Sequence, residues 1–446
     1  MKSTTILTIL IVAGMVIGAL VGEFVLSGTS VGGDHWTKIC GDLILIRPLK
    51  LLVIPLVLFS VVAGITRIGD PRALGRLGSA TLVYYFATML IAVTIGTTLV
   101  QIIQPGELPL ADQMTVQVAG EEAFTSDSSL QQKVGEKTLG GTWTNILFQL
   151  IPTNIVSEMS ASRPLGIIIF AIGLGLALAA GGERTRAARE FFDAGFEGLM
   201  ILIQWVVWLT PLGVFFLVAW TVGKIGLGTI TGPLGGYMGT VFLGLLIHGV
   251  IILPLILWIF GRVRPFAFMS RMKPALLTAF GTDSSSATLP VTIETAIDEG
   301  ECSEKSSNFV LPLGSTINMD GTALYEAVAV LFLFQLYGID LEFGQLIIVV
   351  ITATLAAVGA AGIPSAGLVT MVIVIAAVNG SLGGSETLPV AAIGVILGVD
   401  RLLDMCRTTV NVWGDAVGAR IMTRIAPDTD TETAKTDSIR QNHLTN

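Results

Sequence analysis

The chain has 446 residues, of which 52% are hydrophobic and 13% charged, and its mean hydropathy is +0.79. A soluble domain carries about 25% charged residues, so this composition excludes an ordinary soluble protein and indicates a polytopic helical membrane protein. The formal net charge of −8 argues against nucleic acid as a partner. The three cysteines form no spaced motif, so neither a disulfide framework nor a cysteine metal site is predicted.

The first 260 residues contain apolar stretches long enough, at around 20 residues, to cross a bilayer. We expect spans at about 5–28, 41–66, 79–105, 143–182 (broken by a polar patch), 192–223 and 231–260. The polar, acidic stretch 106–142 has the composition of an exposed insert with little order of its own. Arginines and lysines follow every second span, which places the N-terminus and these basic loops in the cytoplasm.

Small and polar residues interrupt the apolar pattern in the second half of the chain. Residues 266–298 contain a serine triplet and Pro290, residues 305–336 contain the motif NMDGT, and residues 345–380 contain GAAGIPSAG. Alone, a serine triplet is usually a loop, and a glycine-rich stretch usually marks tight helix packing. Together they favour two re-entrant hairpins around a broken helix, because irregular backbone survives at membrane depth only inside protein or beside water. Such breaks point to a transporter's binding site.

The last helical stretch, about 387–425, carries a polar stripe on one face. Its five members, spaced by four, three, four and four residues, are Asp400, Asp404, Arg407, Asn411 and Asp415. At about 100° per residue they share an arc of roughly 80°. Each charge costs about 2.5–3.5 kcal/mol in a membrane, so we expect the stripe to face a ligand, ions or internal water. The alternative is a soluble amphipathic surface helix. The polar tail 427–446 is expected to be disordered.

Four motifs resemble those of the dicarboxylate/amino acid:cation symporters, which include the excitatory glutamate transporters. They are SSSATLPVT (284–292), LPLGSTINMDGTALYEA (311–327), GAAGIPSAG (359–367) and DMCRTTVNVWGD (404–415). The resemblance covers about residues 5–425. It implies an all-α membrane protein with eight transmembrane helices and two re-entrant helical hairpins, built from inverted repeats. It also implies an elevator-type homotrimer in the cell membrane, with both termini cytoplasmic.

The resemblance also divides the chain into domains. The scaffold would comprise 1–78 and 143–223, and the transport domain would comprise 79–105 and 231–425. The insert 106–142, between 79–105 and 143–223, would be extracellular or periplasmic. Within the transport domain, helix 7 would span 305–336 and helix 8 would span 387–425.

An acidic amino acid, glutamate or aspartate, is the substrate that the resemblance implies. Arg407 matches the arginine that meets the substrate's side-chain carboxylate, which its planar fork suits. Asp404, with Thr408 beside it, matches the aspartate that holds the amino group, and Asn411 should contact the α-carboxylate. The remaining pocket positions are Ser285, Ser286, Thr322, Gly362, Ile363, Pro364 and Gly367.

Sodium is the implied coupling ion, and no cofactor is implied. Three sodium sites match Gly314, Asn318, Asn411 and Asp415; Thr316 and Met319; and Asn318, Asp320, Tyr85 and Thr88. All supply oxygen ligands, as a hard cation prefers, apart from the Met319 thioether. Met89 stands where the family usually has serine or threonine, which leaves the third site and the coupling ion open.

Glu326 lies in an otherwise apolar run, where desolvation favours the neutral form of a carboxylate. A glutamate here resembles the proton carrier of the proton-coupled, potassium-countertransporting members, so we hypothesise that Glu326 carries a proton. The alternative is a glutamate that caps a buried threonine or tyrosine. Asp283 stands where members have arginine or serine, and it could pair with Arg407 or Arg401 or face water. Asp400 has no assigned partner.

Other functions stay open at this point. A C4-dicarboxylate such as succinate lacks the amino group that Asp404 would bind, and a purely proton-coupled symporter would not need the sodium sites. An ion channel would not need elements that close over a site. An enzyme is not expected: an intramembrane hydrolase using Ser285 or Ser286 would need a general base, and His248 is the only histidine within a span.

Overall fold

The computed structural model describes residues 3–26, 35–68, 71–126, 151–161, 164–225, 234–358, 366–382 and 387–427. Every regular element in these ranges is a helix, which confirms the all-α class. Four of the described helices are long and apolar enough to span a membrane, and a bent pair would make a fifth. The chain is therefore a multi-pass membrane protein. The tail predicted to be disordered lies, beyond Pro427, outside the described residues.

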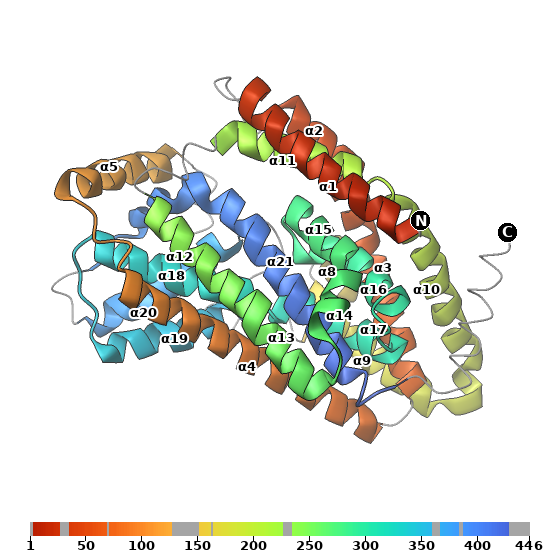
Figure 1. The fold of residues 1–446 in the computed structure, drawn as a ribbon. Helices are drawn as coiled ribbons and strands as arrows, with labels where there is room; N and C mark the ends of the chain where they lie inside the picture. Colours follow the sequence, from red (N-terminus) through yellow and green to blue (C-terminus); the bar gives the residue numbers. More distant parts are fainter. Residues whose placement is uncertain are drawn as a thin grey trace.

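One group of helices packs around α3 and α11 on one side of the molecule (Figure 1). Its members are α1 (Ser3–Val21), η1 (Gly22–Leu26), α2 (Trp36–Gly41), η2 (Asp42–Ile46), α3 (Arg47–Ile68), α8 (Ile155–Ser160), α9 (Pro164–Ala180), η3 (Gly182–Thr185), α10 (Arg186–Val207) and α11 (Thr210–Ile225). The stretch expected to form a span at 192–223 contains two helices, α10 and α11, which are bent by 56° relative to each other. Pro211 in the first turn of α11 lacks the N–H that would continue the helix from α10.

A second group packs around α18 and α21 (Figure 1). Its members are α4 (Pro71–Ile103), α5 (Leu110–Ser126), α12 (Gly235–Leu246), η5 (Ile247–Ile252), α13 (Leu253–Ile256), η6 (Leu257–Gly261), α14 (Pro265–Arg271), α15 (Lys273–Thr282), α16 (Ser285–Asp298), α17 (Glu304–Ile317), α18 (Asp320–Leu336), α19 (Phe343–Val358), α20 (Ala366–Ser381), η7 (Val390–Ile396) and α21 (Leu397–Met422). Every residue of α18 except Gln335 is buried, so this helix forms the centre of the protein.

The interrupted segments form pairs of helices. In the first pair, α15 ends at Asp283, whose φ of +54° is left-handed, and Ser284 caps α16 by accepting a hydrogen bond from the Ala287 amide at 3.1 Å. In the second pair, α19 packs against α20, and the connecting residues 359–365 lie outside the described residues. Between the pairs, α17 and α18 are separated at Asn318 and Met319, the break that NMDGT predicts.

Part of the acidic insert is ordered, contrary to expectation. Residues 110–126 form α5, which packs against η7, and the apolar side chains of Val116 and Phe124 lie against the core. A Cβ on Gly120 would lie 2.4 Å from Val395 Cγ2, so the two elements are in close contact. The insert's charge suggested an exposed coil, but Val116, Gly120 and Phe124 follow one another at four-residue spacing and share the helix face that meets η7. Residues 127–142 lie outside the described residues.

Candidate functional site

The predicted polar stripe lies on α21 and faces the protein interior. Its five residues are each at most 3% exposed, so the alternative of a solvent-exposed amphipathic helix is wrong. Helices α15, α16, α17 and α18 all pack against α21. Because buried charges are costly unless they are paired, the partners of this stripe define the site.

Arg407 lies at the centre of the stripe and is 1% exposed. Its Nε donates to Asp404 Oδ1 at 2.5 Å, and its Nη1 donates to Asp400 Oδ1 at 3.4 Å. The guanidinium carbon lies 4.2 Å from the ring centroid of Tyr325, whose hydroxyl donates to Asp400 at 2.8 Å. Asp400, which had no assigned partner, therefore holds both Tyr325 and Arg407. Tyr325 was missed from the sequence because its apolar neighbours on α18 made it resemble a core residue.

The second helix pair contributes Gly367 to the surroundings of Arg407. A Cβ on Gly367 would lie 2.9 Å from Arg407 Nη1 and 3.3 Å from Thr322 Cγ2. Three predicted pocket residues from three helices therefore meet. The other hairpin positions, Gly362, Ile363 and Pro364, lie outside the described residues.

Asn411 ties α21 to the start of α18. Its Oδ1 accepts from the Gly321 amide at 2.7 Å, and its Nδ2 donates to Thr322 Oγ1 at 3.1 Å and to Met319 Sδ at 3.4 Å. The first turn of a helix leaves backbone N–H groups without intrahelical partners, and Asn411 Oδ1 accepts from two of them, those of Gly321 and Thr322. Thr408 extends the same face, with its hydroxyl 3.4 Å from Asp404 Oδ1.

The predicted ion ligands gather one turn further along α21. Asn318 Nδ2 donates to Asp415 Oδ1 at 2.9 Å, and the Thr88 hydroxyl donates to Asn318 Oδ1 at 3.4 Å. A Cβ on Gly314 would lie 2.3 Å from Asp415 Oδ1 and 2.8 Å from the Tyr85 hydroxyl, so these groups adjoin. Thr316, two residues after Gly314, is buried and donates to the Leu313 carbonyl at 3.0 Å.

Asp320 fits a cation well. Its side chain is fully buried, and Oδ1 has no hydrogen-bond partner among the described residues. The other oxygen, Oδ2, lies 3.2 Å from His248 Nε2 on η5. A buried carboxylate beside amide and hydroxyl oxygens is the donor set that a hard cation prefers. The sequence marked His248 as the lone histidine of a span, but its contact with Asp320 depends on how α12 and η5 pack.

Four further predicted positions lie on or next to helices that pack against α21. Glu326 Oε1 accepts a hydrogen bond from the Thr370 hydroxyl, so α18 is tied to α20. This contact is the one expected of a glutamate that caps a buried threonine. Ser285 and Ser286 begin α16, directly after the turn that holds Asp283. Of the alternatives for Asp283, the structure has the ion pair with Arg401, at 2.8 Å.

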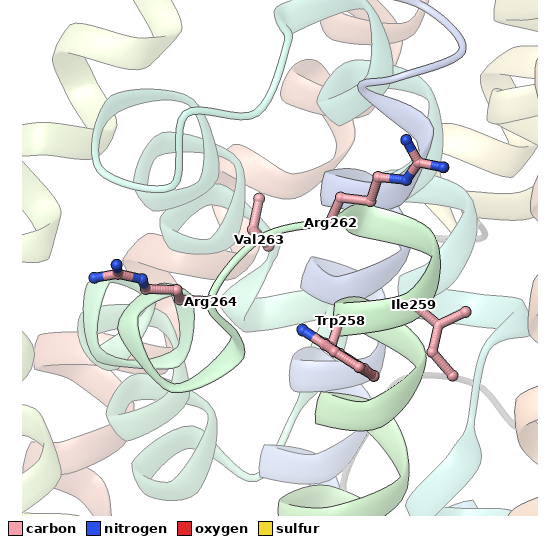
Figure 2. A pocket seen from close by; sticks show the side chains of 5 residues that line it. All are labelled: Trp258, Ile259, Arg262, Val263 and Arg264. Atoms are coloured by element: carbon pink, nitrogen blue, oxygen red, sulfur yellow. The ribbon is translucent and has the colours of Figure 1, made fainter.

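A surface hollow of about 530 Å³ lies elsewhere, at the end of η6. Figure 2 shows the side chains that line it, which are Trp258, Ile259, Arg262, Val263 and Arg264. The side chains of Arg262 and Arg264 point in different directions from their loop (Figure 2). They do not converge on one anion, and the hollow includes no residue of the stripe.

Comparison with known proteins identifies the family. The profile of the sodium:dicarboxylate symporter family matches residues 7–425. Excitatory amino acid transporter 3 of Oryctolagus cuniculus is 38% identical over 93% of this chain and 84% of its own length. Excitatory amino acid transporter 1 of Ambystoma tigrinum is 37% identical (92% and 82%), and an excitatory amino acid transporter of Caenorhabditis elegans is 36% identical (94% and 87%). These relatives are transporters and not enzymes, as expected. The chain belongs to the sodium:dicarboxylate symporter family.

Proposed function

We propose that this protein is a secondary active symporter that takes up glutamate or aspartate together with Na⁺. The observation that carries the proposal is the buried guanidinium of Arg407, with the Asp404 carboxylate 2.5 Å from its Nε. An arginine binds a carboxylate through two parallel hydrogen bonds, and the neighbouring aspartate suits an ammonium group. The names of the relatives, which are excitatory amino acid transporters, support an acidic amino acid.

Substrate binding would exchange the partners of Arg407. Asp404 and Asp400 already occupy the guanidinium, so the substrate's side-chain carboxylate has to replace at least one of them. The released Asp404 would then pair with the substrate's amino group. Each lost charge-assisted hydrogen bond is replaced by another of the same kind, and no buried charge is left alone.

A C4-dicarboxylate is the second candidate substrate, because the family's description names dicarboxylates. Succinate would engage Arg407 but bring no amino group for Asp404. Leaving one member of a buried ion pair without its partner costs about 3–5 kcal/mol. The amino acid is therefore the better match.

The coupling ions follow from the oxygen groups around Asn318, Asp320 and Asp415. Neutral amide and hydroxyl oxygens beside two carboxylates suit Na⁺. Glu326 adds proton coupling, because it is fully buried in α18 and bonded to Thr370 of α20, so its protonation state bears on how the second helix pair sits. Purely proton-driven symport is the alternative, and it predicts uptake without Na⁺.

The transport mechanism that accompanies this function is of the elevator type, in which one group of helices moves relative to the other. We propose eight transmembrane helices and two re-entrant hairpins, α15–α16 and α19–α20, in a homotrimer of the cell membrane with cytoplasmic termini. The helices around α3 and α11 would form the scaffold, and those around α18 would carry the substrate. The gathering of the polar stripe and both helix pairs in the α18 group supports this division.

Uptake into proteoliposomes tests the proposal. The purified protein is reconstituted, and labelled glutamate, aspartate and succinate are offered under imposed Na⁺, H⁺ or K⁺ gradients. We expect glutamate or aspartate uptake that needs inward Na⁺. Arg407→Cys should abolish it, whereas Arg420→Gln on the same helix should not. Uptake of succinate but not of aspartate, or full glutamate uptake by Arg407→Cys, would contradict the proposal.

A further inference from the structure

Asp283 is a buried carboxylate that belongs to neither the proposed substrate site nor the proposed sodium sites. It occupies the left-handed position, φ +54°, that ends α15, and its side chain is fully buried. Its carboxylate lies 2.8 Å from Arg401 Nη1 on α21. Asp404 and Arg407 also act on it electrostatically. The turn before Ser285 is therefore fixed to the striped helix by one ion pair, beside the residues proposed to bind substrate.

Arg401 makes a second contact, with the other group of helices. Its guanidinium carbon lies 5.5 Å from the ring centroid of Trp220, which is on α11 and only 5% exposed. Lys38 Nζ also lies 5.5 Å from this ring. A cation within about 6 Å of an indole face is attracted by its quadrupole. Arg401 thus joins three elements, which are the α15–α16 turn, α21 and α11.

We propose that Arg401 is a positioning residue: its ion pair with Asp283 holds the α15–α16 turn in register with the binding stripe, and its contact with Trp220 stabilises the arrangement of the two helix groups seen here. The tests that measure a KM for glutamate rest on the proposed function. Asp283 and Arg401 belong to one group of helices, so their pair stays together if that group moves. Trp220 belongs to the other group, so a sliding movement has to break its contact.

The ion pair is tested by a double-mutant cycle with Arg401→Gln, Asp283→Asn and the double variant. Asparagine also tolerates the left-handed position. Arg401→Gln leaves a buried carboxylate unpaired beside Asp404, so we expect the KM for glutamate to rise about tenfold. The double variant removes both charges and should return to within about threefold of the wild type. Additive effects of the two changes would overturn the pairing role.

Arg420→Gln is the matched control for Arg401→Gln. Arg420 is on the same helix, but its Nη1 donates only to the Glu301 backbone carbonyl, at 3.0 Å. We expect the KM of Arg420→Gln for glutamate to equal that of the wild type. An equal rise in both variants would mean that any arginine loss on α21 has this effect, and would overturn the inference.

The Trp220 contact is tested by crosslinking across the two groups. A Cβ on Gly281 would lie 3.1 Å from Val214 Cβ on α11, so cysteines at these two positions report the present arrangement. The three native cysteines, Cys40, Cys302 and Cys406, are first changed to serine. We expect Trp220→Leu to slow disulfide formation about threefold, with the KM for glutamate within about twofold of the wild type.

Trp205→Leu, on α10 and 67% exposed, is the control, and it should leave the crosslinking rate unchanged. An unchanged rate in Trp220→Leu would overturn the contact's role. The ion pair and the Trp220 contact can also be tested without a transport assay. The melting temperatures of the double-mutant-cycle variants and the crosslinking rates need only purified protein. A protein that takes up no acidic amino acid but shows these couplings would contradict the proposed function alone.

Discussion

The amide of Asn318 donates a hydrogen bond of 2.9 Å to the carboxylate of Asp415, across 97 positions of the chain. Asn318 lies in the break between α17 and α18, and Asp415 is on the continuous helix α21. The bond joins an irregular segment to a regular one at the place where the predicted sodium ligands meet. Interrupted backbone presents carbonyl oxygens that an intact helix would use in its own hydrogen bonds.

Asp415→Asn tests this part of the site. Loss of the carboxylate removes the negative charge that an ion between α17 and α21 would meet. We expect the Na⁺ concentration for half-maximal uptake to rise about 30-fold or more, with a smaller change in the KM for glutamate at saturating Na⁺. The measurement is glutamate uptake over a Na⁺ titration.

Asp340→Asn, at an exposed position, is its control and should leave the titration unchanged. If Asp415→Asn kept the wild-type Na⁺ dependence, Asp415 would not be a sodium ligand.

Gly367→Ala tests the approach of α20 to Arg407. The added methyl group would lie 2.9 Å from Arg407 Nη1, closer than such contacts allow. Overpacking of this kind costs about 1–3 kcal/mol, so the KM for glutamate should rise about tenfold. Gly380→Ala, on the same helix with open space around its Cβ, should behave as wild type. Equal KM values for the two variants would show that Gly367 does not border the substrate.

Glu326→Gln tests proton coupling. A glutamate that must be protonated for transport makes uptake fall as the pH rises, because fewer proteins hold the proton. Glutamine imitates the protonated form permanently, so uptake by this variant should change little between about pH 6 and 9 and should lose its response to internal K⁺.

Two controls separate this role from a structural one. Glu342→Gln, at an exposed position, should keep the wild-type pH profile. Thr370→Val removes the hydrogen bond to Glu326 but leaves the carboxyl group, so the pH dependence should persist. A Glu326→Gln protein with an unchanged pH and potassium dependence would refute the proton-carrier hypothesis.

Gly120→Ala tests whether α5 is docked on η7. Alanine stabilises a helix over glycine by about 0.5–1 kcal/mol, which taken alone would raise the melting temperature. The new Cβ, however, would lie 2.7 Å from the Val395 backbone nitrogen, which cannot easily move. We therefore expect the melting temperature to fall by about 2 °C. Gly173→Ala on α9, with open space, should raise it slightly. A rise in both variants would mean that α5 does not pack on η7.

Much of the fold could be predicted because hydropathy and breaks are local signals. Apolar length predicts spanning helices, and NMDGT predicts the gap at Asn318, because neither depends on distant residues. The bend at Pro211 and the order of α5 were not predicted. In the first case, the apolar run continues unbroken through a change of direction. In the second, packing of Val116 and Phe124 outweighs a charged composition.

The sequence by itself determined that Asp400, Asp404, Arg407, Asn411 and Asp415 share a helix face, since their spacing follows the 3.6-residue period. Only the tertiary structure decided which partners they have outside α21. These are Tyr325 of α18 for Asp400, Gly321 of α18 for Asn411, and Asn318 in the break before α18 for Asp415. Helical period is a property of the chain. Pairing between helices depends on how they pack, which no spacing along one segment encodes.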